Sequence, residues 1–505
     1  MGRGERRRLR RRGEGGDTPP GNMSVETAEG SGAETAAPRF VFPAHHAPGV
    51  FLGIRFPQLA VMIGGLVLGL ISLHFVPRAL GALVVCGWCV AATALALLPI
   101  NGHHVDDWAL ILAGYATRTR QTRRRGDPRS ITHVLPEVAL LTLERGGRRY
   151  GVLREQQAAG EVTYCTLMQL GAMPFVLRSV EERVNQLNRW GLVLGSLVRE
   201  HSPLSRIQLL HRTAPGAARD NRSWFVRHAD PGSPFFDEAL AEQIDRRPPT
   251  EHENFVVVQV SLTRIGRRQA ARRGGGDVDL GAMSILAAEV ERLRAELHEI
   301  LPGAAVLSPG GVAAVVRNAY DPEARRFHDG HEVSWDSVSP SYEREAATHY
   351  EAQQYCHVTF AVRHFPRLPV DCGFQIPLIL EARAAHCYSI VLQPVPPSRA
   401  LRAAESARTA DLGDAQMRAA RGFIETATRR NQRMGIERRE QELAEGHREF
   451  VYAGYITVSA EGAEALEAAI ADVEDCALRS HLDLQRLVGE QGPAFTFTLP
   501  LCRGL

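Results

Sequence analysis

Two long apolar runs dominate the first quarter of the chain. Residues 59–76 and residues 79–100 carry no formal charge, and Pro77 and Arg78 form the whole connection between them. A helix that crosses a bilayer needs ~20 mostly apolar residues. The pattern therefore predicts a transmembrane hairpin within residues 39–129, in preference to a buried hairpin of an ordinary globular core.

The arginines around these runs predict the orientation of the hairpin. Basic residues gather on the cytoplasmic side of membrane helices, and here they precede the first run and follow the second. The sequence thus predicts a multi-pass protein of the plasma membrane with both termini in the cytoplasm. His103, His104, Asp106 and Asp107 could together bind a metal, but a short amphipathic helix over residues 106–120 at the membrane interface is the favoured interpretation. The expected membrane-interface anchors are Arg55, Trp108 and Tyr115.

Strand and helix patterns alternate over residues 130–505. In the first half, strands are expected at 162–170, 206–212, 255–262 and 304–307, and helices at 179–199 and 280–300. In the second half, strands are expected at 355–362, 389–393, 449–458 and 483–487, and helices at 373–382 and 461–479. This order predicts an α+β class with two ferredoxin-like, split β-α-β units, at residues 130–335 and 336–505.

A charged helical stretch interrupts the second unit. Residues 397–447 alternate Arg and Glu with Ala, which is typical of an exposed helical arm, with a break expected near Gly413. An apolar stripe of Leu401, Ala404, Ala407 and Leu412 on this arm needs a surface to pack on, either the sheet of its own domain or a neighbouring subunit. The N-terminal residues 1–38, by contrast, are rich in Arg, Gly and Pro and predict a disordered tail.

The charged residues exclude whole classes of enzyme. The formal net charge is only +2, and all 59 basic residues are Arg, so a Walker A lysine and a Schiff-base lysine are both impossible. We expect no enzymatic activity, no cofactor and no resident metal. Asp277 and Asp279 could hold a divalent ion in a sugar transferase, but a polar loop and helix cap is the favoured interpretation.

The 8 cysteines are sparse and lie mostly in apolar runs. That usage is typical of reduced, buried thiols rather than a disulfide framework. Cys86 and Cys89 form a single C-x-x-C inside the second apolar run, for which packing is favoured over redox or zinc chemistry.

Two groups of arginines are candidate contacts for a partner or for phosphate. The first is expected in one loop and comprises Arg264, Arg267, Arg268, Arg272 and Arg273. The second lies on the predicted arm and comprises Arg429, Arg430, Arg433, Arg438 and Arg439. A near-neutral net charge argues against specific binding of nucleic acid, whereas anionic lipid is a candidate ligand for basic clusters.

Several motifs resemble those of conjugation proteins. Arg55-Phe56-Pro57-Gln58 and residues 106–109, Asp-Asp-Trp-Ala, resemble the PrgI-like membrane proteins of Gram-positive conjugation loci. The remainder resembles the N-terminal half of VirB-type conjugation ATPases without the ATPase half. The stretches that carry this resemblance to an actinobacterial fusion family are 315–322, 333–335, 355–358 and 495–501.

The resemblance implies a non-enzymatic integral membrane component of a conjugation or type IV-like secretion apparatus. It would dock a separate, hexameric translocation ATPase at the cytoplasmic face and assemble with other channel subunits as part of an oligomeric complex. A membrane subunit of a type VII secretion system is the alternative. A membrane-tethered sugar transferase is a more remote one.

Overall fold

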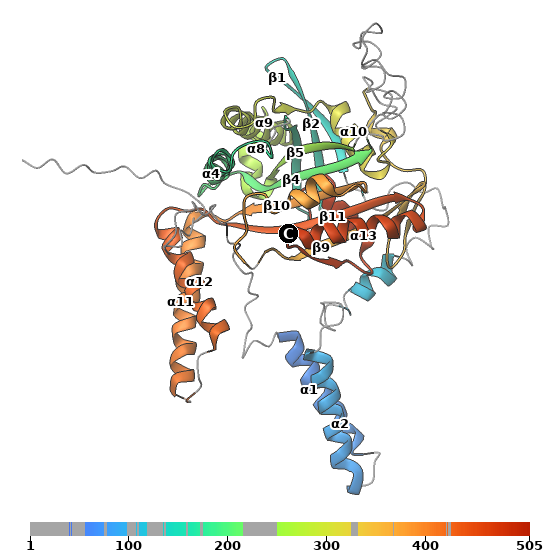
Figure 1. The fold of residues 1–505 in the computed structure, drawn as a ribbon, viewed down its shortest axis with the longest axis vertical. Coiled ribbons are helices and arrows are strands. Elements are labelled where there is room, and N and C mark those ends of the chain that lie inside the picture. Colours follow the sequence, from blue (N-terminus) through green and yellow to red (C-terminus); the bar gives the residue numbers. More distant parts are fainter. Residues whose placement is uncertain are drawn as a thin grey trace, which may run out of the picture.

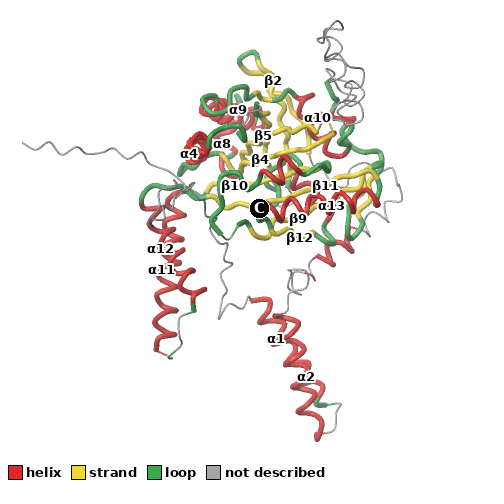
Figure 2. The backbone as a smooth tube through the Cα atoms, viewed as in Figure 1, coloured by secondary structure: helices red, strands yellow, loops and turns green. Residues whose placement is uncertain are grey.

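The computed structural model describes most of the chain after residue 130 and separate segments before it. The described residues are 40, 42, 56–74, 78–97, 108, 111–118, 135, 138–157, 160–171, 175–215, 250–324, 332–366, 368–420, 422 and 426–505. Figure 2 draws the others in grey. The predicted tail over residues 1–38, Arg55 and the His103–Asp107 stretch lie outside the described residues.

The two apolar runs form a helical hairpin of α1 (Phe56–Ser72) and α2 (Arg78–Leu97), which extends away from the sheet (Figure 1). The helices touch closely, because a Cβ added at Gly65 would meet the Cβ of Ala92 at 2.2 Å. Helix α1 has 17 residues, about 26 Å at ~1.5 Å per residue, against a hydrocarbon core of ~30 Å.

The prediction of membrane spans was wrong. Among the described helices, none has both the length and the apolar character needed to cross a membrane. The first uncharged run extends beyond the helix it forms, since α1 ends at Ser72. The predicted fold class, with its transmembrane hairpin, and the predicted multi-pass location in the plasma membrane are therefore corrected.

The described strands form one antiparallel sheet of 12 strands rather than two separate units. The order is β1-β2-β3-β5-β4-β10-β11-β9-β8-β7, with β6 paired to β3 and β12 paired to β9. The strands of the first half are β1 (Val138–Arg145), β2 (Arg148–Gln156), β3 (Val162–Gln169), β4 (Leu204–Pro215), β5 (Thr250–Ser261) and β6 (Ala305–Val306). Those of the second half are β7 (Glu343–Glu345), β8 (Tyr350–Ala352), β9 (Tyr355–His364), β10 (His386–Pro394), β11 (Phe450–Glu461) and β12 (Asp483–Arg486).

A strand order recurs in the two halves of this sheet. The first half contains β6-β3-β5-β4 and the second contains β12-β9-β11-β10, each the order of a split β-α-β unit. The last strand of each order forms the junction, because β4 and β10 pair from His386↔Thr213 to Leu392↔Ile207. Edge-to-edge pairing removes two exposed strand edges and makes the halves one sheet.

Helices and the C-terminal segment cover both faces of the sheet. They are α4 (Val180–Leu197), α7 (Leu262–Ile265), α8 (Arg267–Arg273), α9 (Val278–Leu297), α10 (Pro309–Tyr320), η2 (Trp335–Ser337), η3 (Pro377–Glu381), α13 (Ala463–Arg479), α14 (Gln491–Phe495) and η4 (Thr496–Thr498). The two remaining helices, α11 (Pro397–Ala420) and α12 (Ala427–Ala444), form a hairpin that extends away from the sheet (Figure 1). Along β5, Val256 and Val258 share a core with α9, whereas Val257 belongs to a core with α10 and Phe495. Burial on both faces explains the continuous apolar sequence of this strand.

Helices α8 and α9 cross at a glycine. A Cβ added at Gly281 would lie 1.8 Å from the carbonyl oxygen of Ala270. We expect Gly281→Ala to separate these helices and to lower the free energy of unfolding by about 1–3 kcal/mol, the usual cost of overpacking. Urea denaturation measures the change.

The matched control for this substitution is Gly413→Ala. Gly413 lies inside α11, and an added Cβ would meet nothing within 4 Å. Alanine is a better helix former than glycine by about 1 kcal/mol, so this variant should be as stable as the parent or more stable. Equal destabilisation by both substitutions would contradict a close contact at Gly281.

Candidate functional site

The arm formed by α11 and α12 is a helical hairpin in the second half of the chain. Figure 1 shows the two helices side by side and extending away from the sheet. Among the described residues, the three hydrophobic core clusters contain no side chain from either helix. The predicted break near Gly413 was wrong, because Gly413 lies inside α11, which continues to Ala420.

The base of the arm is fixed to the part of the structure that contains the sheet, here called the body. Ala400 and Ala404, on the first turns of α11, are almost fully buried. The backbone N–H of Ser398 donates to the carboxylate of Glu200 at 3.1 Å, just beyond the end of α4. Where α12 returns to the sheet, its Arg439 pairs with Glu449 at 2.6 Å. These contacts set the direction in which the arm leaves the sheet.

Most of the predicted arm arginines form ion pairs with their neighbours. Arg429 joins the two helices through Asp414 at 3.0 Å, and Arg438 pairs along α12 with Glu442 at 2.9 Å. Arg433 is 3.5 Å from Glu437, also along α12. Of the five, only Arg430 is both exposed and without an ion pair among the residues that the structure describes. Most of these charges therefore hold the arm together.

Apolar side chains on the arm remain exposed. Met417 is 58% exposed and Met434 53%, and Leu401 and Leu412 are also exposed. Ala404 of the predicted stripe is buried at the base, so the stripe is divided between the body and the solvent. Exposed large apolar residues flanked by charges are typical of an interface core with a polar rim.

The first group of arginines lies on two short helices rather than in one loop. Arg264 belongs to α7, and the other four belong to α8. Arg264 donates to the carbonyl of Leu204 at 2.6 Å, and burial, with smaller contributions from the nearby charges of Arg399 and Arg206, lowers its pKa. Arg399 is on the first turn of α11, so the structure brings Arg264 close to the base of the arm. The remaining four are exposed and have no ion pair within the described part of the chain: Arg267, Arg268, Arg272 and Arg273.

Residues 111–118 form a helix that docks on the second half of the sheet. Arg118 pairs with Glu345 of β7 at 3.0 Å and donates to the carbonyl of Gly489 at 2.7 Å. Trp108 and Tyr115 are half-buried here. Their interpretation as membrane-interface anchors depended on the predicted spans, which the structure does not support.

The acidic pair considered for a divalent ion is engaged in local structure. The Asp277 carboxylate caps α9 by accepting from the N–H groups of Asp279 and Leu280. Asp279 accepts from the hydroxyl of Tyr164 at 2.5 Å and lies 3.5 Å from Arg154. Burial, with the Asp279 contact, raises the pKa of Tyr164. The helix cap thus accounts for the carboxylate of Asp277, and the contacts with Tyr164 and Arg154 account for that of Asp279.

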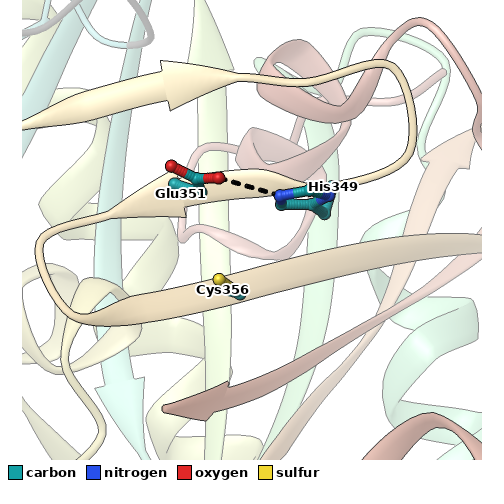
Figure 3. A group of neighbouring side chains, drawn as sticks. All are labelled: His349, Glu351 and Cys356. Carbon is teal, nitrogen blue, oxygen red and sulfur yellow. Dashed lines mark hydrogen bonds and ion pairs between the residues drawn. The ribbon is translucent and has the colours of Figure 1, made fainter. Parts of the chain in front are cut away.

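A different cluster was missed in the sequence. His349, Glu351 and Cys356 offer ligand atoms that all lie within 4.8 Å of one another, and His349 Nε2 is 2.9 Å from Glu351 (Figure 3). The spacing His349-x-Glu351 in a strand pattern could have indicated a shared face. The position of Cys356 opposite them depends on the turn between β8 and β9.

The thiols match the expectation only in part. All 8 cysteines are free, and Cys165, Cys356, Cys476 and Cys502 are buried, but Cys86 is exposed on α2. Burial raises the pKa of Cys387 to about 12, which keeps that thiol protonated and unreactive.

No protein-family model and no curated protein matches this sequence. The resemblance to conjugation proteins therefore stays a prediction that rests on the quoted residues.

Proposed function

We propose that this protein is a non-enzymatic docking component of a conjugation or type IV-like secretion apparatus, and that its arm binds a separate translocation ATPase. The observation that carries the proposal is the helical hairpin of α11 and α12, whose described side chains take no part in the three hydrophobic cores. A helical hairpin that gives no described side chain to these cores contributes little to the stability of the sheet. Its surface is available to a partner.

The side chains of the arm indicate the chemistry of the contact. Met417 and Met434 present flexible, polarisable apolar groups that adapt to a partner surface. The flanking charges of both signs form a rim that sets association rate and salt dependence rather than affinity. A partner with an apolar groove bordered by mixed charges fits this surface.

The sequence supports a division of labour between this chain and its partner. Translocation requires nucleotide hydrolysis, and a chain without lysine cannot form a Walker A site. The partner would supply that lysine and the energy of nucleotide hydrolysis, while this protein would hold the partner in place at the apparatus. A type VII secretion ATPase is the alternative partner, and the identity of the bound chain distinguishes the two.

We expect Met417→Glu with Met434→Glu to reduce binding of the ATPase by about 10-fold or more, since buried anchors carry most of an interface's energy. The full-length tagged protein is purified from its native host, and the P-loop ATPase that copurifies is identified and quantified by mass spectrometry. The arginines that pair within the arm stay unchanged, so that the arm remains folded.

Leu478→Glu is the matched control, because Leu478 is 72% exposed on another helix, α13. It should leave both the melting temperature and the bound ATPase unchanged. If the arm variant retains the ATPase at the parental level, the arm is not the docking surface. Copurification of a type VII ATPase that is lost in the arm variant would support the alternative system.

A further inference from the structure

Three side chains with different ligand atoms share one face of the hairpin formed by β8 and β9. Glu351 lies directly opposite Cys356 in the antiparallel register, and His349 precedes Glu351 by two residues. Positions i and i+2 of an extended strand point to the same face. The imidazole, the carboxylate and the thiol therefore converge, as Figure 3 shows, with their ligand atoms within 4.8 Å of one another.

We propose that His349, Glu351 and Cys356 bind one zinc ion. Imidazole nitrogen, thiolate sulfur and carboxylate oxygen are the three ligand types that zinc takes in proteins, at ~2.0–2.3 Å. A thiolate and a carboxylate together neutralise the two positive charges of the ion, while the imidazole binds in its neutral form. On binding, the thiol proton of Cys356 passes to solvent.

The surroundings fit three protein ligands and one open position. His349 Nδ1 is 3.2 Å from the hydroxyl of Thr348, which leaves Nε2 directed toward Glu351. Such a contact to the second ring nitrogen orients a histidine ligand. The fourth position of a tetrahedral ion would then be taken by water or by a partner residue, as in zinc sites with three protein ligands.

Arg344 pairs with the Glu351 carboxylate and has to move away from it before Glu351 can bind the ion. Its guanidinium pairs with Glu351 from the neighbouring strand β7, where the two residues are opposite each other. The Arg344 side chain is 61% exposed, so it can turn into solvent at little cost, because exposed ion pairs contribute only ~0–1 kcal/mol. Cys356 and Glu351 are largely buried and keep their places.

The position of the cluster suggests a structural role for the ion. Strands β7 and β8 have only three residues each and form one end of the sheet. Glu345 of β7 also holds Arg118 of the preceding helix. A metal that joins β8 to β9 would fix this short hairpin, and with it the place where residues 111–118 dock.

Cobalt titration of the full-length protein tests the proposal. Cobalt(II) substitutes for zinc and gives a thiolate charge-transfer band in the near ultraviolet when sulfur binds. Cys86 and Cys89 are first replaced by Ser, because their C-x-x-C could bind metal independently. We expect one cobalt ion per chain with a charge-transfer band, and displacement of the cobalt by one equivalent of zinc.

Cys356→Ser should abolish this band, and His349→Ala should weaken zinc binding by about 10-fold or more, as loss even of supporting groups does at metal sites. The matched control is Cys372→Ser, which removes a different free thiol, a half-buried one, and should leave the spectrum unchanged. Circular dichroism shows whether each variant is folded. Absence of the band in the parent, or its persistence in folded Cys356→Ser, would overturn the proposal.

Discussion

Replacing Arg212 by Met is expected to lower the free energy of unfolding by about 3–5 kcal/mol, because it removes one member of a buried ion pair. The side chains of Arg212 and Glu253 are only 6% and 11% exposed. Arg212 Nε donates to the Glu253 carboxylate at 2.8 Å, and a terminal nitrogen donates to the carbonyl of Val315 at 2.9 Å. One guanidinium thus joins β4, β5 and α10.

The urea midpoint of the purified protein measures this loss. Arg433→Met is the control, because Arg433 is 3.5 Å from Glu437 on the surface of α12 and its removal should cost less than about 0.5 kcal/mol. Adding Glu253→Gln to Arg212→Met should recover part of the loss, since it removes the buried negative charge. A cost below about 1 kcal/mol for Arg212→Met would contradict the assigned role.

Acidification from pH 7 to pH 5 is expected to destabilise the fold by about 4 kcal/mol, about 2 kcal/mol for each of two buried histidines. Burial lowers the pKa of His386 to about 4 and that of His357 to about 3. The unfolded chain takes up these protons near pH 6.5, before the folded chain can. Stability is therefore lost as the pH falls from about 6.5 toward the folded pKa values.

Urea midpoints at pH 7, 6 and 5 measure the effect. His357→Gln with His386→Gln cannot take up these protons, so its stability should fall less steeply over this range, even though it starts lower. His298→Gln, at an exposed position beyond the end of α9, should keep the parental slope. Equal slopes for the parent and the double variant would contradict the assignment to His357 and His386.

The order of elements could be predicted because it depends on local patterns. Strand β3 begins at the predicted residue, and α4 begins with a capping box in which Ser179 and Glu182 are bonded reciprocally at 3.2 and 3.0 Å. Caps and alternation involve residues a few positions apart. The pairing of β4 with β10 joins residues far apart in the chain, and no local pattern indicates it.

The candidate site was predicted in outline but not in detail. Charge alternation correctly indicated an exposed helical arm, because so many charges cannot be buried. The role of each arginine was not predictable, since Arg429 pairs across the hairpin with Asp414 and only Arg430 stays exposed and without an ion pair in the described residues. The side of a helix that faces its neighbour depends on the turn between the two helices.

The sequence alone determined the α+β composition, the place of the charged arm and the impossibility of a lysine-dependent nucleotide site. These follow from residue types and short-range periodicity. Only the tertiary structure decided that both halves share one sheet, that the apolar runs form helices α1 and α2 too limited to span a membrane, and that His349, Glu351 and Cys356 meet. Each of these depends on where helices end and which strands pair. Strand pairing joins residues that are far apart in the chain, and no short-range pattern in the sequence indicates which of them will meet.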